Sequence, residues 1–212
     1  IATLSDGQTI SASLVIAADG VRSALRDAAG IRTTRWDYHQ TGVIATVEHE
    51  RPHRGIAHEH FLSPGPFAIL PLQGNQSSLV WTEKTAEAER ILRLERTAFD
   101  AEMRQRYGDF MGKVRVVGPR WGYPLRVSLA HQYVAPRLAL VGDSAHGLHP
   151  LAGQNLNLGY RDTAALVEVV IEAARLGLDI GQVGVLRRYE AWRRFDNISL
   201  LAVTDGLNRL FS

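Results

Sequence analysis

Two apolar runs mark the parts of the chain that are expected to form buried strands. Residues 14–18 and 138–141 are continuously apolar, and a polar turn containing Gly and Asp follows each run. Such runs are typical of parallel strands covered on both faces. Apolar residues at helical spacing follow in both places, over 21–29 and after Asn157, and predict helices. Because ligands of open α/β sheets bind beyond the carboxyl ends of the strands, we expect the two runs to lie parallel and adjacent.

The middle of the chain alternates apolar and polar residues, which is typical of antiparallel strands. The predicted strands span 42–47, 56–62, 67–72, 78–82, 114–117 and 121–127. An Asp-Gly turn between 1–4 and 9–13 predicts a hairpin. Helical spacing of apolar residues predicts one long helix over 85–107 and another over 186–210.

Together these elements predict an α/β protein, α+β overall, in which an antiparallel sheet is inserted into a parallel one. We expect residues 1–32 and 128–176 to form the parallel, ligand-binding part. Residues 33–127 are expected to form the inserted sheet with its long helix, and 177–212 a helical C-terminal segment.

Composition narrows the class of protein. The 212 residues are 45% hydrophobic and 22% charged, with a formal net charge of +2, which is ordinary for a globular protein. The arginines are scattered among carboxylates, so nucleic-acid binding is not expected. The absence of Cys excludes disulfides and thiolate metal sites and fits a cytoplasmic protein. No apolar run approaches the roughly 20 residues of a membrane-spanning helix, and the first residues, without Met or a signal-peptide layout, resemble an internal start.

The second polar turn opens a longer pattern of small, polar and cyclic residues. The pattern consists of Gly142, Asp143, Ala145, His146, Pro150, Gly153, Gln154 and Asn157. In this order and spacing it resembles the second flavin-binding motif of the FAD-dependent aromatic hydroxylases, the class A flavoprotein monooxygenases.

The first polar turn resembles another motif of the same family. In that Asp-Gly motif, the strand end and a helix Arg lie near the pyrophosphates of FAD and NAD(P)H. The matching residues are Asp19, Gly20, Arg22, Ser23 and Arg26. Taken alone, Asp-Gly is a common turn and the two arginines a common solvated helix face. Two motifs in the family's order and separation make the resemblance much more specific.

The resemblance implies a partial FAD-binding, Rossmann-like parallel sheet with an inserted antiparallel substrate-domain sheet, as in the para-hydroxybenzoate-hydroxylase-like fold. It places Asp143 near the ribityl chain of FAD, and Pro150 near the reactive face of the flavin as the catalytic candidate. The implied cofactor-binding residues are Asp19, Gly20, Arg22, Arg26, Gly142, Asp143, Pro150, Gly153, Gln154, Asn155 and Asn157.

In the family, the inserted sheet covers the flavin ring and forms the substrate cavity. By this resemblance the candidate walls of the cavity are Phe67, Leu70, Leu72, Trp81 and Tyr123. The alternative for each of them is that it only packs the sheet.

Two residues depart from the family pattern. Ser144 replaces a small Ala and is expected to have little effect, whereas Asn155 replaces a Gly beside the flavin pyrimidine. Asn tolerates left-handed backbone angles, so we expect Asn155 to adopt them. On this expectation a Gly at the position would preserve or improve FAD affinity. A β-branched residue would weaken it by about 1–3 kcal/mol through strain.

Residues 189–197 and 201–211 resemble the ubiquinone-biosynthesis branch of the family, the 2-polyprenyl-6-methoxyphenol hydroxylases. In that family NAD(P)H reduces FAD, and a flavin C4a-hydroperoxide transfers one oxygen atom of O2 to a phenolic substrate. A polyprenyl phenol would favour peripheral contact with the inner membrane. By physical reasoning alone, the same stretch is only an amphipathic helix with a basic end.

One family feature is missing, because the chain contains no Gly-x-Gly-x-x-Gly turn to hold the ADP part of FAD. We therefore expect a portion of a hydroxylase that does not retain stoichiometric FAD by itself. We also expect an uncovered edge of the parallel sheet, which would favour self-association. Two alternatives are a non-catalytic module of a quinone-synthesis assembly and a hydroxylase of a soluble aromatic acid.

Four histidines lie close together in the sequence, with glutamates between them: His49, His53, His58 and His60. Zinc sites need ligands that converge in space, and isolated strand and turn histidines are commoner. We therefore expect no metal site.

Overall fold

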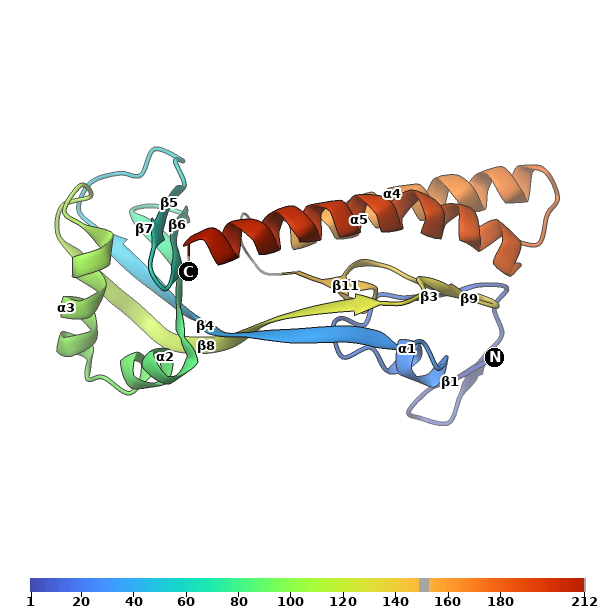
Figure 1. Ribbon diagram of the computed structural model, residues 1–212, viewed down its shortest axis with the longest axis horizontal. Helices are drawn as coiled ribbons and strands as arrows, with labels where there is room; N and C mark the ends of the chain where they lie inside the picture. Colours follow the sequence, from blue (N-terminus) through green and yellow to red (C-terminus); the bar gives the residue numbers. More distant parts are fainter. Residues whose placement is uncertain (149–152, 212) are drawn as a thin grey trace. The chain divides into compact units, whose positions relative to one another are not determined.

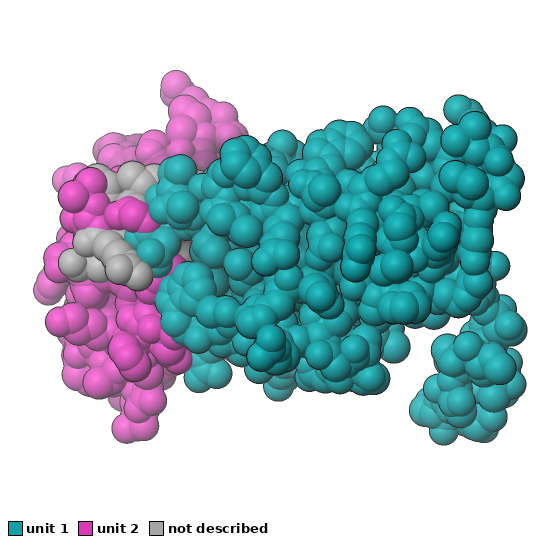
Figure 2. Space-filling model, turned by 45° about the vertical axis from the view of Figure 1, so that its right-hand side comes forward, with its two compact units in different colours: residues 1–36, 126–205 teal, residues 37–125, 206–212 magenta. Residues whose placement is uncertain are grey.

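The computed structural model describes residues 1–148 and 153–211, with the side chains of 207–209 and 211 not described. The chain divides into two compact units, coloured separately in Figure 2. Unit 1 comprises residues 1–36 and 126–205, and unit 2 comprises 37–125 and 206–212. The divisions at 36/37 and 125/126 fall inside two long strands, and each unit has its own hydrophobic core.

The strands of unit 1 are short. They are β1 (Ala2–Thr3), β2 (Thr9–Ile10), β3 (Val15–Ala17), β9 (Val134–Ala135), β10 (Leu138–Leu140) and β11 (His146–Gly147) (Figure 1). β1 and β2 pair antiparallel, which confirms the N-terminal hairpin. β3 and β10 pair parallel, with Ala17 opposite Leu140, which confirms that the two apolar runs are parallel neighbours. β9 joins β10 antiparallel across a two-residue turn, so the predicted parallel sheet is only partly parallel.

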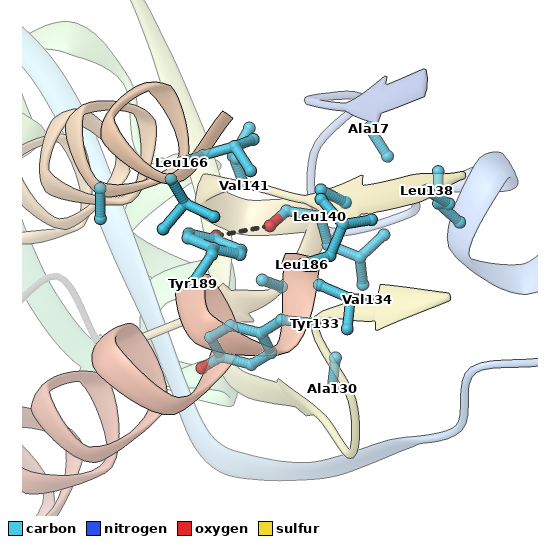
Figure 3. Close-up of a cluster of buried hydrophobic side chains, with 14 of the residues drawn as sticks. Ala17, Ala130, Tyr133, Val134, Leu138, Leu140, Val141, Leu166, Leu186 and Tyr189 are labelled. Carbon is cyan, nitrogen blue, oxygen red and sulfur yellow. Dashed lines mark hydrogen bonds between the residues drawn. The ribbon is translucent and has the colours of Figure 1, made fainter. Parts of the chain in front are cut away.

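Two long helices cover this small sheet. The helical segments of unit 1 are α1 (Ala24–Ala28), the 3-10 turn η1 (Gly142–Ser144), α4 (Asn155–Arg175) and most of α5 (Val183–Phe211). α4 and α5 run alongside each other in Figure 1. Their apolar residues pack on the strands in the core drawn in Figure 3, where the Tyr189 hydroxyl donates to the carbonyl oxygen of Leu140 at 2.7 Å.

Most of unit 2 is an antiparallel sheet. The six-stranded sheet has the order β11-β8-β4-β7-β6-β5, with β4 (Thr33–His49), β5 (His58–Leu62), β6 (Gly65–Pro71), β7 (Gln76–Lys84) and β8 (Val114–Ala130). The alternating segments thus form strands as predicted, but the two segments predicted at 114–117 and 121–127 are one continuous strand. β8 pairs with β4, and the strand continues through Gly118 and Pro119, which lie between the two predicted segments.

The predicted long helix over 85–107 is two helices, α2 (Thr85–Leu92) and α3 (Arg96–Tyr107). The chain breaks at Glu95, whose extended backbone (φ −60°, ψ 155°) redirects it. Both helices bury their apolar sides, including Ile91 and Phe99, in one core. Periodicity did not reveal the break, because apolar residues on both sides of it serve the same core.

The register of unit 2 separates two faces of the sheet. Phe67 and Val43 both lie opposite Trp81, and all three are buried in the core with α2 and α3. Ile44 and Ala68 both lie opposite Val80, one residue along, and are therefore on the other face. The side chains of Ile44, Ala68 and Val80 are half-buried.

Candidate functional site

The two motif-bearing turns of unit 1 are joined by hydrogen bonds at the carboxyl ends of β3 and β10. The backbone N–H of Val141 donates to the carbonyl oxygen of Ala17 at 3.0 Å. The Ser144 hydroxyl, which is fully buried, also donates to the Ala17 carbonyl oxygen, at 2.6 Å. We expected Ser in place of Ala to have little effect, but the Ser144 hydroxyl connects the two strands.

Arg26 adds a second connection between the turns. Its side chain is fully buried and donates through one terminal nitrogen to the carbonyl oxygens of Val21 and Ser144, each at 3.1 Å. Arg26 therefore holds the first turn to the second from inside, whereas Arg22 is exposed. The sequence alternative of a solvated helix face applies to Arg22 and not to Arg26.

The first turn presents an exposed carboxylate. Asp19 accepts a hydrogen bond from the backbone N–H of Leu25 at 3.2 Å, and Gly20 follows with a left-handed φ of 82°. Burial alone would raise the pKa of Asp19, but hydrogen bonds from Ser23 and from the backbone outweigh it and lower the pKa below its ordinary value. Asp19 is therefore an ionised acceptor at neutral pH.

The second turn also presents a carboxylate, that of Asp143. Asp143 is exposed as a residue, yet protein atoms surround its carboxyl group. The resulting desolvation raises the pKa of Asp143, and His146 only partly offsets this effect. Gly142 before it has a left-handed φ of 59°. A Cβ on Gly142 would lie 3.7 Å from the Cα of Gly159, so two glycines let α4 pass close beneath the turn.

A buried carboxylate on α4 supports the same turn from inside the core. Asp162 is fully buried and accepts from the Gly142 N–H at 3.0 Å and from Nε2 of His146 at 2.5 Å. Its other oxygen accepts from Nε of Arg193 at 2.8 Å and from Nδ2 of Asn197 at 3.3 Å. Burial alone would raise the pKa of Asp162, but His146, Arg193 and the Gly142 N–H outweigh it and lower the pKa.

Asp162 was not among the predicted site residues, and Arg193 and Asn197 were noted only as signs of kinship. A four-residue spacing puts Arg193 and Asn197 on the same side of a helix, and this spacing indicates that the two side chains can contact the same partner. Nothing local in the sequence indicated that their partner would be Asp162, which lies 31 residues before Arg193.

Asn155 does not adopt the left-handed backbone that we expected. It is the first residue of α4, and the non-Gly residues with positive φ among those described are His39, Arg54 and Arg137. Its side-chain Nδ2 donates to the carbonyl oxygen of Leu148 at 3.0 Å, so Asn155 ties the start of α4 to the preceding chain. Asn155 thus has the backbone of a helix start, and the left-handed angle lies at Gly153, with φ 60°.

Replacing Asn155 is therefore expected to act through this hydrogen bond. Asn155→Gly and Asn155→Val should each lower the free energy of unfolding by about 1–2 kcal/mol, with Gly at least as harmful because it favours helix poorly. Urea unfolding of the two variants, with FAD titration alongside, checks this. Tighter FAD binding by Asn155→Gly would instead support the left-handed expectation.

The remaining predicted cofactor residues lie around the N-terminus of α4. Gly153 and Asn157 are exposed, and Gln154 is half-buried and accepts from the Asn157 amide at 3.2 Å. Pro150 lies outside the described residues.

The predicted substrate walls fall into two groups. Phe67 and Trp81 are at most 1% exposed and pack in the core of unit 2, so the sheet-packing alternative describes both. Leu70, Leu72 and Tyr123 are exposed and stay candidates.

The clustered histidines make local contacts. Buried His49 contacts the Ser77 hydroxyl through Nε2 and the Arg51 carbonyl oxygen through Nδ1, at 3.0 and 2.7 Å. Within 1–148 and 153–211, no three His, Cys, Asp or Glu side chains converge as metal ligands would. In the same described part of the chain, no helix has the length and apolar character needed to cross a bilayer.

A family model described as "FAD binding domain" matches residues 2–194. The chain belongs to the FAD binding domain family. This assignment confirms the flavoprotein family predicted from the two motifs.

The chain is also similar to proteins named for ubiquinone biosynthesis. It is 56% identical over 211 residues to ubiquinone hydroxylase UbiL of Rhodospirillum rubrum, covering 100% of this chain and 49% of that protein. It is 38% identical over 202 residues to 3-demethoxyubiquinol 3-hydroxylase of Escherichia coli, covering 95% of this chain and 51% of that protein. The chain thus spans about half the length of these relatives.

A solved structure supports the fold. The structure of PqsL from Pseudomonas aeruginosa with 2-aminobenzoylacetate aligns with a TM-score of 0.84 and 23% identity, covering 99% of this chain and 58% of that one. At this identity the likeness concerns the fold alone, and it confirms the predicted combination of helices and sheets with an antiparallel sheet.

The turns of unit 1 fit the FAD expected from this family. A Cβ on Gly20 or Gly153 would meet nothing within 4 Å, so a large ligand can approach the backbone of both turns. Asp19 and Asp143 present carboxylates that can accept hydrogen bonds from hydroxyl groups of a ligand. Because Ser144 and Arg26 link the turns by buried hydrogen bonds, the two acceptors are carried by turns that are held to each other.

Proposed function

We propose that this chain forms the flavin-side and substrate-side part of an FAD- and NAD(P)H-dependent monooxygenase that hydroxylates a phenolic ring in ubiquinone biosynthesis. The observation that carries the proposal is the joining of the two glycine–aspartate turns at the ends of parallel strands β3 and β10. The names of the relatives support the pathway.

The residues of this chain supply binding and orientation, while FAD, when bound, supplies the redox chemistry with NAD(P)H and O2. Asp143 and Asp19 would hold FAD by accepting hydrogen bonds from its hydroxyl groups. Gly20 and Gly153 would let the backbone approach the cofactor closely, because a Cβ on either meets nothing within 4 Å.

We propose that the substrate contacts the face of the unit 2 sheet that α2 and α3 do not cover. Ile44, Ala68 and Val80 share that face by register, and Leu70 lies opposite Ser78 on it. These side chains are half-buried or exposed, so they offer apolar surface to a ligand. Such a surface suits a prenylated phenol better than a charged aromatic acid. Leu72 and Tyr123, both exposed, are further candidates.

A prenylated substrate resides in a membrane, so we propose a cytoplasmic enzyme that contacts the inner membrane peripherally. Assembly with other quinone-synthesis proteins and self-association are further proposals. Flotation with inner-membrane lipid vesicles, and light scattering of the purified protein, test them.

The deciding experiment uses the whole protein and the variant Asp143→Ala. We expect wild type to bind FAD and to oxidise NAD(P)H faster with a prenylated phenol than with a carboxylated one. Asp143→Ala should weaken FAD binding about 10- to 100-fold, as loss of a hydrogen bond to a charged group predicts. The matched control is Asp109→Ala, which changes an exposed aspartate of unit 2.

For the proposal to stand, hydroxylated product must appear while the FAD-loaded enzyme consumes NAD(P)H. FAD binding without any phenol turnover would favour the non-catalytic module. Preference for the carboxylated phenol would favour the soluble-acid alternative. Equal FAD affinity of wild type and Asp143→Ala would remove Asp143 from the site.

A further inference from the structure

We propose that Arg193 and Asn197 of α5 are positioning residues of the cofactor site, and that they act through the buried carboxylate of Asp162. The inference rests on the proposed function, because it concerns the turn that carries Asp143.

The geometry of Asp162 carries the first step. One carboxylate oxygen, Oδ2, accepts from the backbone N–H of Gly142 and from Nε2 of His146. The other oxygen, Oδ1, accepts from Arg193 and Asn197. One oxygen thus faces the turn and the other faces α5, so the carboxylate bridges α5 to the backbone beside Asp143.

The contacts of Arg193 suit it to holding the Asp162 carboxylate in place. Both side chains are at most 3% exposed, and Arg193 also donates to the Asn197 side-chain oxygen at 3.0 Å. The opposite terminal nitrogen of Arg193 pairs with Asp196 at 2.5 Å, and Asp196 pairs with Arg161 of α4 at 2.8 Å. A planar guanidinium can donate to all three acceptors at once. A lysine ammonium, whose donors all sit on one nitrogen, cannot match this geometry.

Other hydrogen bonds hold the rest of this turn, including that from the Ala145 N–H to the Gly142 carbonyl oxygen at 2.8 Å. The Gly142 N–H and Nε2 of His146, however, are both directed at Asp162. The direction of the Gly142 N–H and the ring orientation of His146 therefore depend on where Asp162 is held. Loss of Arg193 or Asn197 removes one of the two donors to Oδ1, so the carboxylate is held less firmly and the position of Oδ2 is less fixed.

The test uses the whole protein with the variants Arg193→Met, Arg193→Lys and Asn197→Ala. The matched control is Arg188→Met, which removes an exposed ion pair between the same two helices, that with Glu172 at 2.7 Å. The readouts are the Kd for FAD, the visible spectrum of the bound flavin and its midpoint potential. Circular dichroism establishes that each variant is folded.

We expect Arg193→Met to weaken FAD binding at least tenfold and to shift the spectrum and midpoint potential of the flavin that remains bound. Asn197→Ala should shift them in the same direction by less, and Arg193→Lys should restore only part of the loss. Arg188→Met should stay within about twofold of wild type, as exposed ion pairs contribute little.

A double variant shows whether Arg193 acts through Asp162. If it does, Asp162→Asn combined with Arg193→Met should weaken FAD binding no more than Asp162→Asn alone. Additive losses would overturn the proposal, as would a folded Arg193→Met protein with wild-type Kd and spectrum. If Arg193→Met does not fold, Asn197→Ala decides by the same readouts. If wild type itself fails to bind FAD, the proposed function fails instead, so the two failures are distinguishable.

Discussion

Replacing Asp162 with Ala is expected to lower the free energy of unfolding of the whole protein by about 3–5 kcal/mol, because a buried charge loses its partner. Asp196 still pairs with Arg193, which places the expectation at the lower end of that range. Urea unfolding measures the loss. The control is Glu172→Gln, which removes an exposed ion pair from the same helix and should cost less than about 1 kcal/mol. Equal losses for the two variants would show that the buried network does not stabilise the fold.

The carboxylate of Asp162 also makes the free energy of unfolding depend on pH in the acid range. Because folding lowers the pKa of Asp162, its contribution to stability is complete above the pKa of an unfolded aspartate, about 3.9. The contribution is lost as pH falls below that value and through the lower pKa of the folded state. The stability advantage of wild type over Asp162→Asn should therefore begin to shrink near the acid end when unfolding is measured from pH 7 down to pH 3. An unchanged difference over that range would contradict this.

Replacing Trp81 with Ala is expected to lower the free energy of unfolding by about 3–5 kcal/mol, the cost of truncating a buried aromatic residue. Trp81 is 1% exposed and packs edge-on against Phe67 and Phe99, with ring centroids 5.8 and 5.7 Å apart. Its Nε1 donates to Glu83 at 3.0 Å, and the Arg106 guanidinium lies 4.5 Å from its ring. The core placement thus predicts a loss of stability rather than a selective loss of substrate affinity.

Leu70→Ala is the matched control for Trp81, because Leu70 lies on the other face of the sheet and is 40% exposed. We expect it to change stability by less than about 1 kcal/mol and to raise KM for a prenylated phenol. Thermal or urea unfolding and steady-state kinetics separate the two effects. A stable Trp81→Ala protein with a raised KM would restore Trp81 to the wall of the substrate cavity.

The motifs were predictable because each is local. A strand end, a Gly-Asp or Asp-Gly turn and a helix follow one another within a few residues, so the two turns and their resemblance to the family motifs could be read directly from the sequence. The alternating segments likewise predicted the antiparallel strands of unit 2. The break at Glu95 and the helical backbone of Asn155 were missed, since both depend on where the neighbouring helix packs.

The sequence by itself determined the family, the two glycine–aspartate turns and the parallel adjacency of β3 and β10, because short-range spacing and apolar runs encode them. The tertiary structure decided which side chains serve the turns from inside. Arg26 and Ser144 join the two turns, and Asp162 ties Gly142 to Arg193. These contacts join residues up to 127 positions apart, and burial makes their hydrogen bonds necessary, so no local pattern could reveal them.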